Sequence, residues 1–92
     1  MCRNIRVLYN FEPPTTPEEV EAAALQYVRK VSGLRAPSAA DRKAFDHAIH
    51  EIAHATEHLL AALSARTAVR TREGEREKAR ARGARRRATA PA

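Results

Sequence analysis

Apolar residues recur at helical spacing in two segments of the chain. Between Pro17 and Ser32 the recurring residues are Val20, Ala24, Tyr27, Val28 and Val31. Between Ala39 and Ala65 they are Phe45, Ile49, Ile52, Thr56, Leu59 and Leu63, with Leu60 widening the stripe. Spacings of three and four residues place each set on one face of an α-helix. The pattern predicts an all-α fold with a short helix at about 17–32 and a long helix at about 39–65.

Capping residues mark the ends of these helices. Thr16 followed by Glu19 forms the sequence pattern of a capping box, and Gly33 supplies a left-handed residue that closes the first helix. Ser38 is expected to cap the second helix, with Asp41 three residues later. Because residues 33–37 form only a short loop, the two helices are expected to fold back on each other as a two-helix hairpin.

Residues 5–11 are expected to form an extended N-terminal arm, which Pro13 and Pro14 end. No second strand is evident to pair with it. At ~1.5 Å per residue the short helix spans roughly 24 Å and the long one roughly 40 Å, so the far end of the long helix is left bare. We expect the arm to cover that end, where the apolar residues are Leu59, Leu60 and Leu63.

The predicted core is small. About a dozen large apolar side chains, at ~1.5–3 kcal/mol each, must offset the conformational entropy of ordering the folded part of the chain. The two contributions nearly cancel for a scaffold of this size. Dimerisation into a four-helix bundle would supply the missing burial, so the sequence suggests a homodimer.

The charge divides the chain into two parts. Residues 1–65 hold seven Lys/Arg and eight Asp/Glu, whereas residues 66–92 hold ten Lys/Arg and three Glu. The second part has only Val69 as a large apolar residue and contains Gly74 and Gly83. We therefore predict a compact helical domain at 1–65 and an Arg-rich flexible tail at 66–92, either disordered or a fraying solvated helix.

The chain opens Met-Cys-Arg-Asn-Ile and carries Leu-Gln-Tyr-Val-Arg-Lys-Val-Ser-Gly at residues 25–33, followed by Pro37-Ser38 and Phe45. In these motifs it resembles an uncharacterised family of short bacterial proteins, a domain of unknown function. The resemblance implies a compact helical unit. It implies no catalytic activity, cofactor or partner.

Four histidines fall within one sector of the long helix, opposite its apolar face. His50-Glu51-Ile52-Ala53-His54 matches the H-E-x-x-H pattern of zinc peptidases, and His58 follows one turn later. The third ligand and the substrate-binding sheet of those enzymes have no counterpart in the sequence. An exposed polar face is the favoured interpretation. The alternative is a zinc-binding protein or zinc-dependent hydrolase that uses His50, His54 and His58.

The tail offers a second candidate site. Its arginines match phosphate geometry, and no aromatic residue is interleaved to stack on bases. The favoured function is a non-enzymatic interaction module whose tail binds nucleic acid or ribosomal RNA without sequence preference; no cofactor is expected. The candidate nucleic-acid-binding residues are Arg80, Arg82, Arg85, Arg86 and Arg87. A solvating tail shaped by genome composition is the competing interpretation.

The remaining features concern the compartment. Cys2 is the one cysteine, so an internal disulfide is excluded and a reducing compartment is suitable. No apolar run is long enough to cross a membrane, and no signal peptide is visible. The sequence therefore predicts a cytoplasmic protein with no membrane partner.

Overall fold

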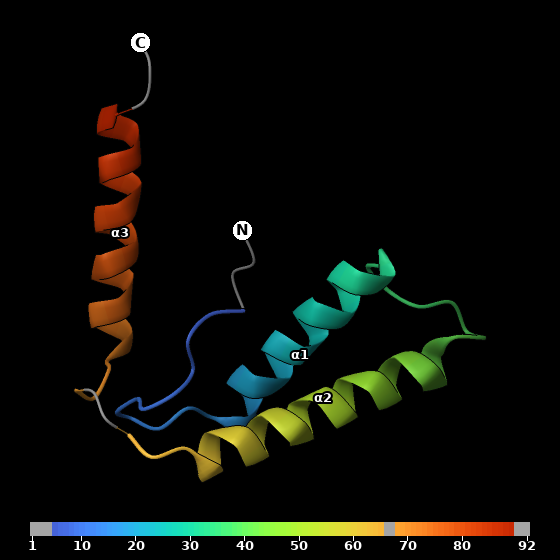
Figure 1. The fold of residues 1–92 in the computed structure, drawn as a ribbon. Helices are drawn as coiled ribbons and strands as arrows, with labels where there is room; N and C mark the ends of the chain where they lie inside the picture. The colour runs from blue at the N-terminus through green and yellow to red at the C-terminus, as the bar shows by residue number, and fades with distance from the viewer. Residues whose placement is uncertain (1–4, 66–67, 90–92) are drawn as a thin grey trace.

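The computed structural model describes residues 5–65 and 68–89 and is all-helical (Figure 1). Its three helices are α1 (Pro17–Ser32), α2 (Arg42–Ala62) and α3 (Arg72–Thr89). Within the described ranges no strand forms; the sheet-like pairing there is one parallel bridge between Phe11 and Arg70. None of these helices is long and apolar enough to span a membrane. The all-α prediction is confirmed, but the number of helices is three, not two.

Helix α1 begins and ends where its capping residues predict. The Thr16 hydroxyl accepts a hydrogen bond from the Glu19 backbone N–H, and the Glu19 carboxylate accepts one from the Thr16 N–H. Gly33 has a φ of 71°, and its N–H donates to the Arg29 carbonyl. This left-handed conformation carries a steric cost for residues with a Cβ, so glycine suits the position.

Helix α2 is shorter than predicted at both ends. Residues 39–41 form a turn, and Asp41 instead of Ser38 occupies the N-cap position. The Ser38 hydroxyl donates to the Asp41 carboxylate and is thereby drawn away from the backbone N–H groups that it was expected to cap. At the other end Leu63 is extended, with φ −75° and ψ 146°, so the helix stops at Ala62.

The core lies between α1 and α2, which run side by side in opposite directions (Figure 1) and are the only two helices of the described chain that pack against each other. The buried apolar residues are Leu8, Val20, Ala24, Val28 and Phe45. Tyr27 and Val31 were assigned to the buried face of α1, but they are 48% and 67% exposed. Helical spacing puts Tyr27 at one edge of the predicted stripe, whereas Val31 lies in the last turn of α1, one residue before the helix ends.

The arm packs beside the end of α2 but covers less of it than predicted. Leu8 is buried and Phe11 half-buried, and both line a cavity of about 310 Å³ together with Leu60. Leu59 and Leu63 remain 55% and 46% exposed. The arm therefore approaches the side of α2 nearest α1, and the outer side of the last turn stays open.

The prediction of a disordered tail is wrong for residues 72–89, which form α3. The helical alternative is the one observed. A local start signal explains it: the Thr71 hydroxyl accepts a hydrogen bond from the Gly74 N–H, and Glu73 and Glu75 lie in the first turn. Acidic residues at a helix N-terminus complement its dipole. Beyond its first residues α3 extends away from α1 and α2 (Figure 1).

Candidate functional site

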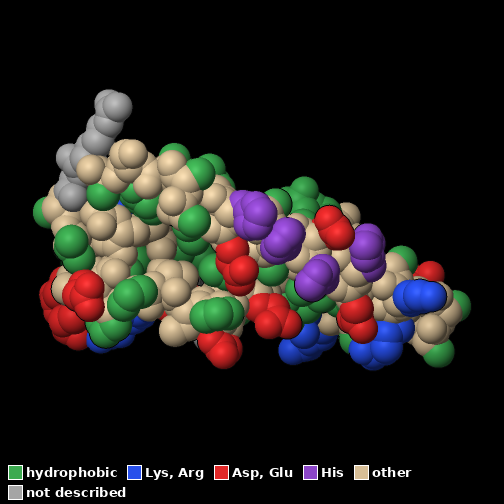
Figure 2. Space-filling model, turned by 90° about the horizontal axis from the view of Figure 1, so that it is seen from below, with side chains coloured by type: hydrophobic (Ala, Val, Ile, Leu, Met, Phe, Trp, Pro, Cys, Tyr) green, Lys and Arg blue, Asp and Glu red, His purple; other side chains and the backbone are tan. Residues whose placement is uncertain are grey.

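The four histidines of α2 lie together on its surface. Figure 2 shows their side chains next to one another, with Asp and Glu side chains on both sides. The rings of His50 and His54 are nearly parallel, with centroids 6.2 Å apart, and those of His54 and His58 are tilted at 4.3 Å. His47 lies 3.7 Å from the Glu51 carboxylate. The predicted clustering of imidazoles on one helix face is therefore present.

His50 and His54 also border a shallow groove of about 290 Å³ between α1 and α2. Its acidic lining residues are Glu21, Asp46 and Glu57. Within residues 5–65 and 68–89, no three His, Cys, Asp or Glu side chains are arranged to hold a metal ion. The structure therefore gives no support to a zinc centre built from His50, His54 and His58. Cys2, the other potential ligand, lies outside the described residues.

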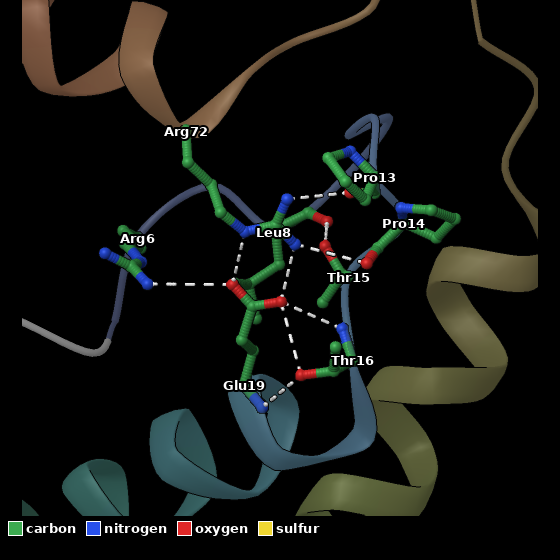
Figure 3. Close-up of polar contacts among 8 residues, drawn as sticks. All are labelled: Arg6, Leu8, Pro13, Pro14, Thr15, Thr16, Glu19 and Arg72. Carbon is green, nitrogen blue, oxygen red and sulfur yellow. Dashed lines mark hydrogen bonds and ion pairs between the residues drawn. The ribbon is translucent and has the colours of Figure 1, made fainter.

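A polar junction that the sequence analysis did not anticipate joins α3 to the rest of the molecule. Its centre is the bidentate pair between Arg72 and Glu19 (Figure 3): Nε donates to Oε2 at 3.0 Å and Nη2 donates to Oε1 at 2.7 Å. Arg72 also donates to the carbonyls of Pro13 (2.8 Å) and Pro14 (3.1 Å). Its guanidinium lies 5.3 Å from the centroid of the Phe11 ring. One side chain thus ties α3 to both the arm and α1.

The Glu19 carboxylate is the shared acceptor of this junction. It receives the Arg72 bonds, completes the capping box with Thr16, and lies 3.8 Å from Arg6 (Figure 3). Hydrogen bonding from Arg72, and next from the Thr16 backbone, lowers the pKa of Glu19 to about 2 from its ordinary 4.5. The same pairing raises the pKa of Arg72. Donors from two segments stabilise the charged carboxylate, as expected for charge-assisted hydrogen bonds.

Arg70 extends the junction along the arm. Its backbone N–H donates to the Asn10 carbonyl at 2.8 Å, and its carbonyl accepts from Glu12 N–H at 2.9 Å. Its guanidinium donates to the Tyr9 carbonyl at 2.8 Å. The arm, which the sequence leaves without a pairing partner, finds one in residues 68–72.

Charge along α3 is segregated. All three of its acidic residues lie in the first half. Each forms an ion pair with a basic residue three positions later: Glu73 with Arg76 (2.6 Å), Glu75 with Lys78 (3.1 Å) and Glu77 with Arg80. No acidic residue follows Glu77 in the sequence. The outer half of α3 therefore contributes only positive charge.

The five predicted nucleic-acid-binding arginines all lie in α3 but differ in their surroundings. Arg80 is engaged with Glu77 and lies 3.6 Å from Glu73. Arg82, Arg85 and Arg86 are exposed in the outer half of α3. Arg87 is also in α3, but its side chain is not among those described. Whether these residues bind a polyanion stays a prediction.

Comparison with known proteins gives one family match. A family described as "Uncharacterized conserved protein (DUF2277)" matches residues 1–78. The chain belongs to this family. No curated protein and no solved structure matches it. The predicted resemblance to an uncharacterised family is confirmed at that level, whereas the individual motifs and the bacterial origin stay predictions.

The DUF2277 match extends past the predicted domain boundary at residue 65. It includes Arg70, Arg72 and the inner part of α3 up to Lys78, so the junction lies inside the family segment. The outer arginines of α3 lie beyond it. A function of those arginines would therefore concern this chain and not the matched segment of the family.

Proposed function

We propose that this member of the DUF2277 family is an interaction module that attaches to nucleic acid through the outer half of α3, without reading sequence. The observation that carries the proposal is the segregation of charge along α3. The acidic residues near the junction are paired, and Arg82, Arg85 and Arg86 follow in a stretch with no acidic residue. Such a helix end is attracted to phosphates because binding releases their condensed counterions.

The position of α3 supports the same proposal. Arg72 and Arg70 hold its N-terminal end against the arm and α1, while the rest extends away from the packed helices (Figure 1). An extended duplex or RNA can then approach the outer half without meeting α2. In this proposal α1 and α2 form the scaffold, the protein works in the cytoplasm, and a homodimer would present two such helices.

Absence of sequence preference follows from the residue types. The outer half contains arginine, alanine and glycine up to Thr89, with no aromatic ring to stack on a base. Arginine forks bind phosphate oxygens in a bidentate manner. Contacts to phosphates hold a protein on nucleic acid but carry no direct sequence information.

Fluorescence anisotropy with full-length protein tests the proposal. Two duplex DNAs and two RNAs of unrelated sequence should bind with similar affinity, and the logarithm of affinity should fall linearly with the logarithm of salt concentration. Replacing Arg85, Arg86 and Arg87 by Gln should weaken binding to all four. The matched control replaces three exposed basic residues outside α3, namely Arg35, Arg42 and Lys43. This control should weaken binding less than the α3 variant does.

Two results would contradict the proposal. One is a full-length protein that ignores all four nucleic acids at low salt. The other is a strong preference for one sequence, because that would require base-reading contacts that arginine–phosphate pairs do not provide.

A further inference from the structure

The two sides of the hairpin formed by α1 and α2 differ in character. Glu21 of α1 and Asp46 and His50 of α2 line the groove on one side, which is therefore polar. On the other side, a spacing of about 100° per residue gives α2 a continuous row of apolar residues. We call this row the apolar strip; its members are Ala44, Ala48, Ile52, Ala55, Leu59 and Ala62.

Most of the apolar strip is open to solvent. Its exposed members are Ala44, Ala55, Leu59 and Ala62, and its half-buried members are Ala48 and Ile52. Tyr27 lies about 120° around α1 from Glu21, so its exposed side chain is on the same side of the hairpin as the strip. Within the described ranges α3 packs against neither α1 nor α2. The strip and Tyr27 therefore form an accessible apolar surface.

The chain also exposes more surface than a compact protein of its mass. Its accessible surface is 7310 Å², whereas a folded monomer of 10.2 kDa exposes about 5300 Å². The extended position of α3 accounts for part of this difference. A stable interface needs only ~800 Å² from each copy. Because the described part of the chain buries only five apolar side chains, further burial against a partner would stabilise the hairpin.

We propose that the apolar strip packs against the same strip of a second copy of this chain, so that two hairpins form a four-helix bundle with twofold symmetry. The proposal names the contact surface of the homodimer. It concerns the scaffold of α1 and α2, so it stands whether or not α3 binds nucleic acid.

The order of side-chain sizes along the strip favours a second copy in antiparallel orientation. The first half of the strip has only the small side chains of Ala44 and Ala48, and the second half has the large side chain of Leu59. If the two strips cross near Ile52, Leu59 of one copy lies opposite Ala44 and Ala48 of the other. Large side chains then face small ones, which fills the interface without voids. Parallel strips would instead set Leu59 against Leu59.

The charged residues nearest to the strip lie at its border. By helical spacing Glu51 and His58 lie at the outer edge of the strip, and both are exposed. Glu51 already has His47 within 3.7 Å. The centre of the proposed interface is therefore apolar and its rim polar, as is usual for protein interfaces.

Analytical ultracentrifugation of the full-length protein tests the proposal. The natural protein should sediment as a species of twice the monomer mass of 10.2 kDa. Ala55→Arg places a charge in the middle of the strip and should raise the dimer dissociation constant at least ~100-fold, since that charge would be buried without a partner. His54→Arg adds the same charge at the neighbouring position on the polar side. This matched control should leave the dissociation constant nearly unchanged.

Both variants should keep the fold of the hairpin, which circular dichroism and urea denaturation verify. An arginine at position 54 or 55 follows Glu51 by three or four residues, a spacing at which opposite charges stabilise a helix. A loss of dimer in Ala55→Arg alone, with helicity intact, would therefore report on the interface and not on folding.

Disulfide crosslinking tests the antiparallel register independently. In a Cys2→Ser background, Ala48→Cys/Ala55→Cys should link two copies under mild oxidation, because position 48 of one copy faces position 55 of the other. Within one copy these positions are ~10 Å apart along the helix axis, too far for a disulfide. Neither single cysteine variant should crosslink on a non-reducing gel.

Three results would overturn the proposed packing. The first is a natural protein that stays monomeric up to its solubility limit. The second is a dimer that Ala55→Arg and His54→Arg weaken equally, because the contact would then lie elsewhere. The third is crosslinking of a single cysteine variant in place of the pair, which would require parallel strips. Each of these results leaves the nucleic-acid assay of the proposed function unaffected.

Discussion

Helices α1 and α3 have similar lengths, 16 and 18 residues, but different interactions stabilise them. Helix α1 buries Val20, Ala24 and Val28 against α2 and the arm. Helix α3 packs against neither of the other helices and is supported by pairs of opposite charge three residues apart. One helix depends on tertiary packing and the other mainly on its own sequence.

The energies of these interactions differ in size. Full burial of a Val side chain contributes roughly 1.5–3 kcal/mol, whereas an exposed ion pair within a helix contributes about 0.2–0.5 kcal/mol. Three such pairs do not equal one well-buried residue of α1. We therefore expect the described part of the chain to contain a cooperative unit around α1 and α2, with a less stable outer end of α3. The following experiments test this difference.

The largest effect is expected at Phe45, the buried aromatic residue of α2. Phe45→Ala should lower the free energy of unfolding by about 3–5 kcal/mol, because it leaves a cavity between α1 and α2. Urea denaturation followed by circular dichroism measures the loss. Val31→Ala is the control at a position that is 67% exposed and should change stability by less than about 0.5 kcal/mol. A loss below about 1 kcal/mol for Phe45→Ala would mean that this packing is not the main source of stability.

A second experiment compares truncations on either side of the junction. Residues 1–66 should retain helical circular dichroism and cooperative melting, as the boundary near Ala65 predicts. They lack Arg70 and Arg72, however, so their free energy of unfolding should be lower. Residues 1–78 retain those contacts and should match the full-length protein. An unfolded 1–66 fragment would show that the predicted boundary is wrong, and equal stability of both fragments would show that the junction contributes little.

The pH dependence of stability tests the Glu19 carboxylate. Its pKa is about 2 in the folded protein, against the ordinary 4.5. Because the folded pKa is the lower one, the unfolded state takes up the proton first. The stabilisation is therefore complete above about pH 5 and is lost as the pH falls through 4.5 toward 2. Glu19→Gln should be less stable than the natural protein above pH 5, with a difference that shrinks in acid.

Arg72→Gln provides the control for that measurement, because it removes the same bidentate pair from the other side. The double variant should lose less stability than the sum of the two single variants, since both changes eliminate the shared pair. A difference between Glu19→Gln and the natural protein that stays constant from neutral to acidic pH would count against the charge of Glu19 as the cause.

The smallest effect is expected in the outer part of α3. Gly83→Ala should increase its helical content, because Ala is favoured over Gly in a helix by about 0.5–1 kcal/mol. The midpoint of the cooperative transition should hardly move, since Gly83 lies in the part of α3 that packs against no other helix. Circular dichroism at low temperature measures the first quantity and thermal melting the second. A raised melting midpoint would show that α3 is coupled to the α1–α2 core.

Much of the local structure was predictable because short-range chemistry determines it. The capping box of Thr16 and Glu19 and the left-handed Gly33 gave both ends of α1. The start of α3 had a readable signal as well, since Thr71 is a good N-cap followed by Glu73 and Glu75. The apolar pattern alone left this segment either disordered or a fraying solvated helix, because packing is only one of the interactions that stabilise helices.

The arrangement of the candidate sites, too, was only partly predictable from the sequence. Helical spacing alone places the histidines of α2 on one face and Arg82, Arg85 and Arg86 on one face of α3. Spacing alone does not say that Arg80 is engaged with Glu77. It also does not say whether imidazoles on one face come together in a geometry suited to a metal ion.

The sequence by itself determined the all-α class, the bounds of α1 and the uneven distribution of charge, because each depends on residues within a few positions of one another. Only the tertiary structure decided which apolar residues are buried and where α3 is attached. Glu19 and Arg72 are 53 positions apart, and their bidentate pair forms only once the arm, α1 and the start of α3 meet. A contact of that kind depends on the path of the whole chain, which local propensity does not specify.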